Sequence, residues 1–288
     1  MIPAVEVKNL THYYQGGNRT KVTAIDDISF TVEKGELLGI IGHPGSGKST
    51  LIQHLNGLLK PDSGEILVDG KSIWESKETL RQSRFKVGLC FQYPEYQLFE
   101  ETVFKDISFG PKNMKLSDAE IKERVINAAK FVGLSYDLLN KSPFDLSGGE
   151  KRRAAIAGVM AMNPEVLVLD EPAAGLDPLG RSQLIEMIRE YRCQTGSTVI
   201  LVSHNMEDIA MLADRVLVLN KGTVAMHGTV DEVYSKGEEL RQMGLNVPEI
   251  TEVFALLRQK GFDLPANVYS VEKAVSCMKA LIEGRASR

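Results

Sequence analysis

The sequence predicts an α/β protein in which a largely parallel sheet is covered by helices. Almost fully apolar runs recur at 37–41, 166–169, 198–202 and 216–219, as expected of strands that are buried on both faces. Segments with helical periodicity lie between several of these runs, and this alternation is typical of an α/β sheet. A glycine-rich turn directly follows the first run.

The first 35 residues are predicted to form strands. Apolar and polar residues alternate over 5–7 and again over 28–32, which indicates a half-buried sheet. Residues 16–18, Gly-Gly-Asn, are expected to form the turn between them. A later strand is expected at 87–91. The helix expected after the glycine-rich turn has an apolar face made of Leu51, Ile52, Leu55 and Leu58.

The middle of the chain, roughly residues 95–162, is predicted to be more helical. Ser117 and Glu120 have the spacing of a capping box, in which each side chain satisfies a backbone N–H of the other residue. They are therefore expected to open a helix. Further helices are expected at 151–162 and 181–194, the second of them amphipathic.

The pattern changes after Gly244. Pro248 is expected to open one short helix and Ser270 a second, each with an apolar stripe at helical spacing. Two helices of this length do not bury enough surface for an independent core. We therefore expect this tail to pack on the main domain or on a partner.

The composition of the 288 residues is that of an ordinary globular protein. Hydrophobic residues make up 43% and charged residues 25%, which excludes gross disorder. There are 34 Lys and Arg against 38 Asp and Glu, so the formal net charge is −4. A protein whose main partner is a nucleic acid usually has a clear basic excess, so no nucleic-acid partner is expected.

Cysteine usage and hydropathy indicate the setting of the protein. Cys90, Cys193 and Cys277 form no CxxC pair and no metal-ligand spacing, so thiols in a reducing compartment are expected. No apolar run approaches the roughly 20 residues of a membrane span, and the first residues lack the pattern of a signal peptide. We expect a soluble, cytoplasmic protein, which leaves docking on a membrane protein open.

Residues 42–49 match the phosphate-loop pattern G-x-x-x-x-G-K-[ST] without a gap, between a predicted strand and a predicted helix. Its glycines let successive N–H groups face one concavity, to which the helix N-terminus adds partial positive charge. Lys48 is expected to reach the β- and γ-phosphates of a nucleotide, and the Ser49 hydroxyl to bind Mg²⁺. The other candidate contacts of this loop are Gly42, Gly45, Ser46, Gly47 and Thr50.

Two carboxylates follow the apolar run at 166–169. Asp170 stands at the strand end, where it can hold a magnesium ion through its water shell. Glu171 points to the other face and is a candidate general base, or a group that polarises an attacking water. Asp-Glu pairs also occur at ordinary solvated strand ends, so this interpretation depends on the phosphate loop upstream.

A second anion-binding pattern occurs where Ser147, Gly148 and Gly149 precede a helix, since helix N-termini bind anions. A chain with one phosphate loop does not need another cradle for the same nucleotide. The simplest interpretation is that this segment serves the nucleotide of a partner subunit. The alternative is a flexible helix cap without a ligand.

The phosphate loop, Leu-Ser-Gly-Gly at 146–149, the Asp-Glu strand end and Ser203-His204 resemble the ATP-binding cassette family in order and spacing. The resemblance spans roughly residues 4–240. It implies a P-loop ATPase with a RecA-like core, an antiparallel β subdomain and a helical subdomain at about 95–162. It also implies ATP and Mg²⁺ as cofactors.

The resemblance extends to single residues. Gln92 matches the Q-loop glutamine, which contacts Mg²⁺ and senses the transmembrane partner. Tyr14 matches the aromatic residue that stacks on adenine, with Tyr13 as the alternative. Asp177 matches the D-loop at the dimer interface, and His204 matches the switch histidine at the γ-phosphate.

The sequence departs from the family pattern at two places. The signature ends in Glu150, where glutamine is commoner, and residues 173–174 are Ala-Ala, where Thr-Ala is frequent. Neither departure alters the expected catalytic residues, which are Lys48, Glu171 and His204. An active ATPase is therefore expected.

Residues 92–103, Gln-Tyr-Pro-Glu-Tyr-Gln-Leu-Phe-Glu-Glu-Thr-Val, are similar to the ATP-binding subunits of energy-coupling factor transporters. These take up vitamins and, in related systems, cobalt or nickel ions. Residues 41–43 and 175–181 also fit this branch, as does a short helical tail containing Val247-Pro248. The Glu-Glu-Thr-Val form resembles the second of the two paralogous ATPases better than the first.

This resemblance implies two ATPase chains, identical or paralogous, with a transmembrane T subunit and a substrate-binding S subunit, at the cytoplasmic face of the membrane. The T subunit is expected to dock near the Q-loop, where Glu95, Glu100 and Glu101 could pair with its basic residues. Alternatively, the aromatic residues of this segment are local core and its glutamates a solvated face. The apolar contacts proposed for docking are Phe91, Tyr93, Tyr96, Leu98 and Phe99.

The chain is expected to divide into a nucleotide-binding domain at 1–243 and a C-terminal helical dimerisation extension at 244–288. Each nucleotide would lie between Lys48 of one chain and Ser147 of the other. Three alternatives stay open: another importer ATPase, fed by a binding protein or serving cobalt or nickel; a non-transport cassette ATPase; and an interaction protein with a degenerate site.

Overall fold

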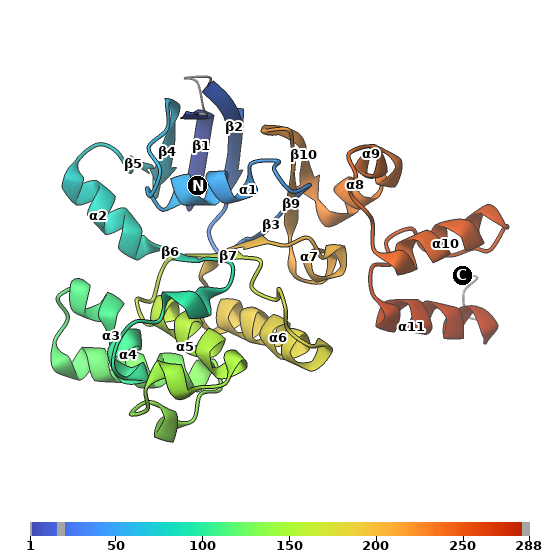
Figure 1. The fold of residues 1–288 in the computed structure, drawn as a ribbon. Helices are drawn as coiled ribbons and strands as arrows, with labels where there is room; N and C mark the ends of the chain where they lie inside the picture. Colours follow the sequence, from blue (N-terminus) through green and yellow to red (C-terminus); the bar gives the residue numbers. More distant parts are fainter. Residues whose placement is uncertain (1, 16–20, 284–288) are drawn as a thin grey trace.

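The computed structural model describes residues 2–15 and 21–283, which form two sheets surrounded by helices (Figure 1). One sheet is antiparallel, with the order β2-β1-β4-β5, and the other has the order β10-β9-β3-β8-β7-β6. In the second sheet neighbouring strands are parallel from β9 to β6, whereas the edge strand β10 is antiparallel to β9. The strands are β1 (Val5–Gln15), β2 (Lys21–Val32), β3 (Leu37–Gly42), β4 (Ser63–Val68), β5 (Lys71–Ser72), β6 (Val87–Cys90), β7 (Val166–Asp170), β8 (Thr198–Val202), β9 (Arg215–Asn220) and β10 (Thr223–Thr229).

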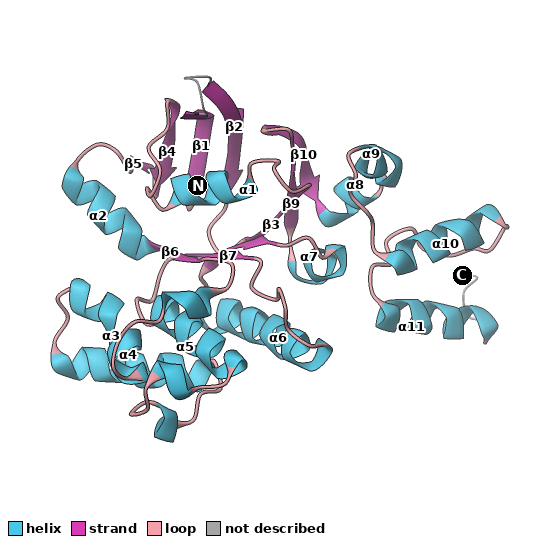
Figure 2. Ribbon diagram, viewed as in Figure 1, coloured by secondary structure: helices cyan, strands magenta, loops and turns pink. Residues whose placement is uncertain are grey.

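Helices cover the six-stranded sheet, and Figure 2 shows α3, α4, α5 and α6 gathered on the side away from the antiparallel sheet. Among the described residues, none of the helices has the length and apolar character of a membrane span. The helices are α1 (Lys48–Leu55), α2 (Lys77–Lys86), α3 (Val103–Asn113), α4 (Asp118–Phe131), α5 (Gly148–Met160), α6 (Pro178–Thr195), α7 (Met206–Leu212), α8 (Val230–Tyr234), α9 (Gly237–Gln242), α10 (Glu249–Gln259) and α11 (Val271–Ile282).

The two faces of the six-stranded sheet bury separate apolar clusters. Along β3, Leu38 and Ile40 join a cluster with α1 and the antiparallel sheet, whereas Leu37 and Ile41 join the cluster under the helices on the other face. This alternation follows from the two-residue period of a strand. Because both faces are covered, every residue of β3, β7 and β8 is buried. The apolar runs in the sequence arise because these strands are buried on both faces. The predicted α/β fold is confirmed.

Several predicted elements differ in their ends. The helix after the phosphate loop stops at Leu55 and Leu58 is 47% exposed, because Gly57 turns the chain with a φ of +66°. Strand β6 stops at Cys90, one residue earlier than expected. Helix α5 begins earlier than expected, and α6 begins at Pro178, directly after its cap. The turn expected at 16–18 lies outside the described residues.

The capping box predicted at Ser117 is confirmed. The backbone N–H of Glu120 donates to the Ser117 hydroxyl, and the Glu120 carboxylate accepts the Ser117 N–H at 2.9 Å. Helices α2 and α7 were not expected from the sequence. Helix α2 is strongly polar and α7 has 7 residues, so neither shows a long apolar stripe.

The tail helices α10 and α11 enclose a small apolar cluster of their own. Phe254 and Val268 are at most 1% exposed in this cluster, where they pack with Leu264 and Ala274. The loop between the helices contributes Leu264 and Val268 to this cluster. The tail also packs on the main domain, as expected, because Tyr269 lies against the main core beside Tyr234. The tail stands beside α8 and α9 (Figure 1), to which it is joined by polar contacts.

Phe254→Ala is expected to unfold the tail while leaving the rest of the fold intact, because the tail cluster is separate. A buried Phe→Ala change costs about 3–5 kcal/mol, which a cluster of this size cannot absorb. Hydrogen exchange of the full chain should show lost protection over 249–282 and unchanged protection in β3, β7 and β8. Phe262→Ala, at a side chain 46% exposed, is the control and should change little. Loss of protection in the sheet as well would contradict the separation.

Candidate functional site

The phosphate loop connects β3 to α1 at the carboxyl end of the parallel strands. Its backbone passes so close to neighbouring strands that two positions require glycine. A Cβ on Gly47, where φ is +102°, would lie 2.7 Å from the carbonyl oxygen of Ala24. A Cβ on Gly42 would lie 2.5 Å from the carbonyl oxygen of Leu219. Strands β2 and β9 thereby fix the loop from both sides.

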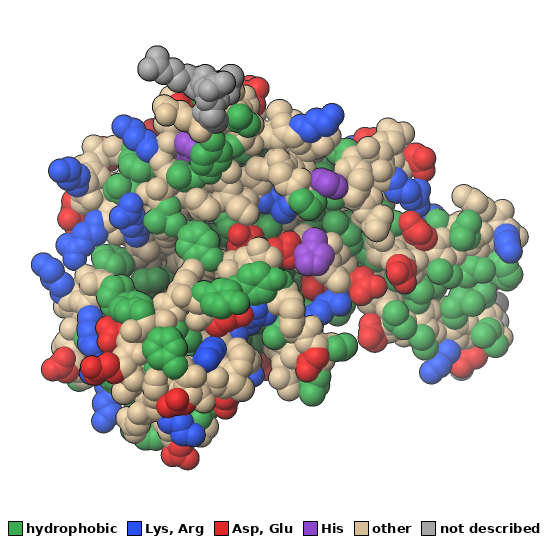
Figure 3. All heavy atoms as spheres, in the orientation of Figure 1, with side chains coloured by type: hydrophobic (Ala, Val, Ile, Leu, Met, Phe, Trp, Pro, Cys, Tyr) green, Lys and Arg blue, Asp and Glu red, His purple; other side chains and the backbone are tan. Residues whose placement is uncertain are grey.

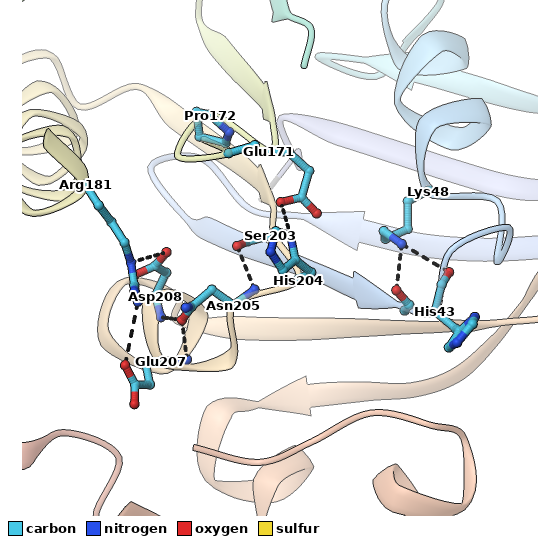
Figure 4. A network of polar contacts seen from close by, with 12 residues as sticks. His43, Lys48, Glu171, Pro172, Arg181, Ser203, His204, Asn205, Glu207 and Asp208 are labelled. Atoms are coloured by element: carbon cyan, nitrogen blue, oxygen red, sulfur yellow. Dashed lines mark hydrogen bonds and ion pairs between the residues drawn. The ribbon is translucent and has the colours of Figure 1, made fainter. Parts of the chain in front are cut away.

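Lys48 folds back over this loop. Its ammonium donates hydrogen bonds to the carbonyl oxygens of Gly42, at 2.6 Å, and His43, at 3.2 Å (Figure 4). Burial lowers the pKa of Lys48, and the carboxylates of Glu171 and Asp170 act in the opposite direction. The Ser46 N–H donates to the His43 carbonyl at 3.0 Å, and its side chain lies beside Gly42.

Asp170 ends β7 beside the phosphate loop and is 6% exposed. Burial, and secondly the charge of Glu171, raise the pKa of Asp170 to about 6, and the neighbouring Ser49 hydroxyl acts in the opposite direction. Over the described ranges, no cluster of three or more His, Cys, Asp and Glu is suited to a metal ion. Magnesium uses one or two carboxylates and keeps several waters, so the oxygens of Ser49 and Asp170 fit it. Gln92, exposed just after β6, is a further oxygen donor on a neighbouring strand end.

Glu171 leaves the strand direction and faces His204. Its φ of +49° lies in the left-handed region, which is uncommon for a residue with a side chain and costs about 1–3 kcal/mol. The Glu171 N–H donates to the carbonyl of Val202 at 2.9 Å, so β8 holds this conformation. The carboxylate oxygen Oε2 lies 2.7 Å from His204 Nδ1 (Figure 4). Strained backbone thus brings the two expected catalytic side chains together.

A second network fixes the segments on either side of this pair. Asp177 caps α6 by accepting the Gly180 N–H at 2.7 Å. On the next turn, Arg181 bonds the buried carboxylate of Asp208 in α7 at 2.7 and 2.9 Å (Figure 4). This ion pair ties the helix after the Asp177 segment to the helix after His204. The sequence analysis did not assign either residue this role, because the pairing partners are on different elements.

Ser147 caps α5 together with Glu150, the residue at which the signature departs from the family pattern. The Glu150 carboxylate accepts the Ser147 hydroxyl at 2.6 Å and the Ser147 N–H at 2.8 Å. Gly148 and Gly149 form the first turn of α5. Within the part of the chain that the structure describes, no hydrogen bond joins these three residues to the phosphate loop.

Arg152, two residues after Glu150, is a further residue that the sequence analysis missed. Its guanidinium is 5% exposed and makes a two-point ion pair with Glu95, at 3.0 and 3.2 Å. It also donates to the carbonyl oxygens of Pro172 and Ala174. Glu95 therefore has an ion-pair partner within its own chain. Glu101 likewise pairs with Lys105, and Phe91 packs against the cluster under the antiparallel sheet.

Tyr14 and Tyr13 point to different surroundings. Tyr14 is 43% exposed, and its hydroxyl lies 3.3 Å from the Thr50 hydroxyl in α1, directly after the phosphate loop. The Tyr13 ring instead lies under Lys21, whose ammonium is 5.2 Å from the centre of that ring. Tyr14 is thus the tyrosine next to the phosphate loop.

Together, the fold and this site define an ATP-binding cassette ATPase. Residues 25–174 match the family described as "ABC transporter", so the chain belongs to the ABC transporter family. The structure resembles that of cbiO1 from Clostridium perfringens, described as part of the ABC transporter complex cbiONQ. The TM-score is 0.73 at 40% identity, over 87% of this chain and 98% of that one. It also resembles the dimeric ATP-binding cassette MJ0796 bound to ADP and Pi, with a TM-score of 0.71 at 27% identity over 78% and 98% of the chains.

Curated relatives identify the branch of this family to which the chain is most similar. The energy-coupling factor transporter ATP-binding protein EcfA2 of Caldanaerobacter subterraneus subsp. tengcongensis is 52% identical over 94% of both chains. The protein of the same name from Clostridium tetani is 48% identical over 99% of both chains. This chain is therefore an ATP-hydrolysing subunit of the energy-coupling factor transporter type. The alternatives of a non-transport cassette and of a degenerate site are set aside.

Asp170→Asn is expected to stabilise the nucleotide-free chain while removing its response to magnesium. The substitution removes a buried charge next to Glu171, so the melting temperature at pH 8 should rise by about 2–4 °C. Added MgATP should then give a much smaller further rise than in wild type. Thermal melts with and without MgATP test this, with the exposed Asp137→Asn as the control. A fall in melting temperature of the nucleotide-free variant would contradict the charge argument.

Proposed function

We propose that this chain binds MgATP and hydrolyses it as one half of an ATPase pair that drives an energy-coupling factor importer. The observation that carries this proposal is the placement of Lys48, Asp170 and the Glu171–His204 pair around one phosphate loop. The family is one of ATPases, and the cited relatives are named as transporter ATP-binding proteins. The roles of single residues and the partners belong to the proposal.

Within one chain, Lys48 exchanges the carbonyls of Gly42 and His43 for the β- and γ-phosphates when nucleotide enters. With and without nucleotide, the Lys48 ammonium has oxygen atoms that accept its hydrogen bonds, so the exchange leaves no buried charge unpaired. Ser49, Asp170 and Gln92 would hold magnesium, which neutralises developing phosphate charge. Glu171 orients or deprotonates the attacking water, and His204 keeps the carboxylate aimed at the site.

The site is completed by a second ATPase chain, identical or paralogous. Ser147 and the N-terminus of α5 offer an anion cradle that is not bonded to the phosphate loop of their own chain, and Asp177 caps a helix in the adjoining segment. A partner's ATP would be held between its Lys48 and this Ser147. The dimeric form of the MJ0796 cassette supports such a pairing. Water cleaves the bond to the γ-phosphate, and release of the resulting inorganic phosphate removes an anion that joins the two helix ends and lets the pair open.

The tail at 244–288 is proposed to be a dimerisation extension of the nucleotide-binding domain at 1–243. Helices α10 and α11 and the loop between them leave large apolar side chains exposed although they enclose a cluster of their own. Figure 3 shows hydrophobic side chains gathered on the tail in this view. A face of this kind indicates a protein contact. The exposed members are Val253, Leu256, Phe262, Val271, Val275 and Ile282.

A groove beside the helical segment is proposed to receive the transmembrane T subunit. It has a volume of about 460 Å³ and is lined by Leu98, Phe99 and Phe109, the two phenylalanine rings meeting edge to face at 5.1 Å. The apolar lining suits the side chains of a partner helix. The assembly would include a substrate-binding S subunit and place this chain at the cytoplasmic face of a membrane, importing a vitamin or related micronutrient. The membership of cbiO1 in a transporter complex supports membrane partners.

Glu171→Gln is expected to lower ATP turnover of the assembled complex by at least about 100-fold, because the amide cannot accept the proton of water. ATP binding should persist, so the two ATPase chains should stay associated longer in MgATP. Turnover and size-exclusion chromatography of the purified complex test both outcomes. Glu165→Gln, at an exposed residue on the same segment, is the control. Undiminished turnover would exclude the assigned role of Glu171.

Phe99→Glu is expected to reduce recovery of the transmembrane partner with the tagged chain by about tenfold or more, since a charge enters an apolar interface. The partners recovered from membranes would be identified by mass. Phe144→Glu, at an exposed residue of the helical segment outside the groove, is the control. Equal recovery of the T subunit with Phe99→Glu would place its docking site elsewhere.

A further inference from the structure

Two histidines that take no part in the roles above lie behind Tyr14. His12 in β1 and His54 in α1 face each other with ring centroids 4.7 Å apart and planes at 69°. His54 is fully buried, and the side chain of His12 is 12% exposed. Apolar residues would fill this junction between the antiparallel sheet and the phosphate-loop helix without the cost of burying imidazoles. Two imidazoles in contact here therefore call for a specific role.

The two histidines contact Tyr14, which is expected to stack on adenine, and Thr50, whose hydroxyl lies beside that of Tyr14. The ring of His12 meets that of Tyr14 edge to face, with centroids 4.8 Å apart at 90°. His54 Nδ1 donates to the carbonyl oxygen of Thr50 at 2.8 Å, and the Thr50 hydroxyl is the group beside the Tyr14 hydroxyl. Tyr14, His12, His54 and Thr50 thus form a closed ring of contacts around one point.

Asp62 contacts this group of four residues through His12 and also bonds the backbone of Tyr13. Its carboxylate lies 3.1 Å from His12 Nδ1 and accepts the backbone N–H of Tyr13 at 2.9 Å. Burial lowers the pKa of His54, and the adjacent His12 acts in the same direction. His54 therefore stays neutral, with Nδ1 carrying the proton that Thr50 accepts. The bond to Thr50 sets the orientation of the His54 imidazole, and the ring contacts with Tyr14 and His54 set that of His12.

We propose that His12 and His54 are positioning residues that hold the Tyr14 ring in the orientation in which it stacks on the nucleotide base. An exposed tyrosine near a strand end otherwise samples several rotamers, and ordering it on binding lowers affinity. Edge contact with His12 and the hydroxyl contact with Thr50 leave the exposed ring face for the base. This inference rests on the role of Tyr14 in the proposed function.

Equilibrium binding of two ligands to the full chain tests the inference: MgATP, which has a base, and magnesium tripolyphosphate, which has none. His12→Ala should raise the Kd for MgATP about tenfold, the range of one base–aromatic stack, and leave the Kd for tripolyphosphate within twofold. His12→Gln, which keeps a polar group near Asp62 but loses the ring edge, should behave alike. His12→Phe restores the ring edge and should return the MgATP value to within threefold of wild type. Val22→Ala, next to Tyr14 on β2, is the control and should change neither.

A loss of affinity for both ligands by equal factors would overturn the inference, because His12 would then support the phosphate loop rather than the base. Tyr14→Ala separates this inference from the proposed function. If Tyr14→Ala weakens MgATP alone while both His12 variants bind like wild type, base stacking stands and the positioning role fails. If Tyr14→Ala changes neither ligand, base stacking by Tyr14 fails and the positioning role with it.

Discussion

The buried guanidinium of Arg152 is the constraint on which the arrangement of the functional segments depends. It holds Glu95 after the Q-loop through two hydrogen bonds and the loop after Glu171 through two more, all from the helix that Ser147 begins. The fork of donors is planar and rigid, so these three segments cannot move independently without leaving a charge unpaired. A displacement at the apolar groove near Glu95 therefore reaches the backbone beside Glu171.

The carboxyl end of β7, with Asp170 and Glu171, is locally unfavourable and is held in place by the residues around it. Asp170 and Glu171 place two carboxylates side by side, one of them buried, and Glu171 has a left-handed backbone. The sheet that bears them is buried on both faces, so its position is fixed by packing on two sides. Strain at the strand end can then persist without local unfolding. The middle of the sheet thus supplies stability, whereas the strained, charged residues lie at the carboxyl end of β7.

Local features of the sequence predicted much of this structure. The buried strands, the phosphate loop and the Asp170-Glu171 strand end could be predicted because each is a short pattern whose physical cause lies within a few residues. The pairs Arg152–Glu95 and Arg181–Asp208 could not, because their members are 57 and 27 residues apart and meet only when helices pack. The end of α1 was misjudged because Leu58 fits the helical period, although Gly57 ends the helix. The contacts of Ser147 with another chain are proposed from the resemblance and are not visible in one chain.

The separate cluster inside the tail has a consequence for how such a subunit can diversify. Phe254 and its neighbours stabilise α10 and α11 without atoms from the sheet, and polar contacts such as that of Tyr269 with Asp231 attach them. Substitutions on the outer surface of the tail therefore leave the packing around the phosphate loop untouched. After gene duplication, two such chains can drift apart in partner preference while both keep the same catalytic machinery. The surface that selects a partner and the packing that supports the nucleotide site are in this sense encoded in separate parts of one polypeptide.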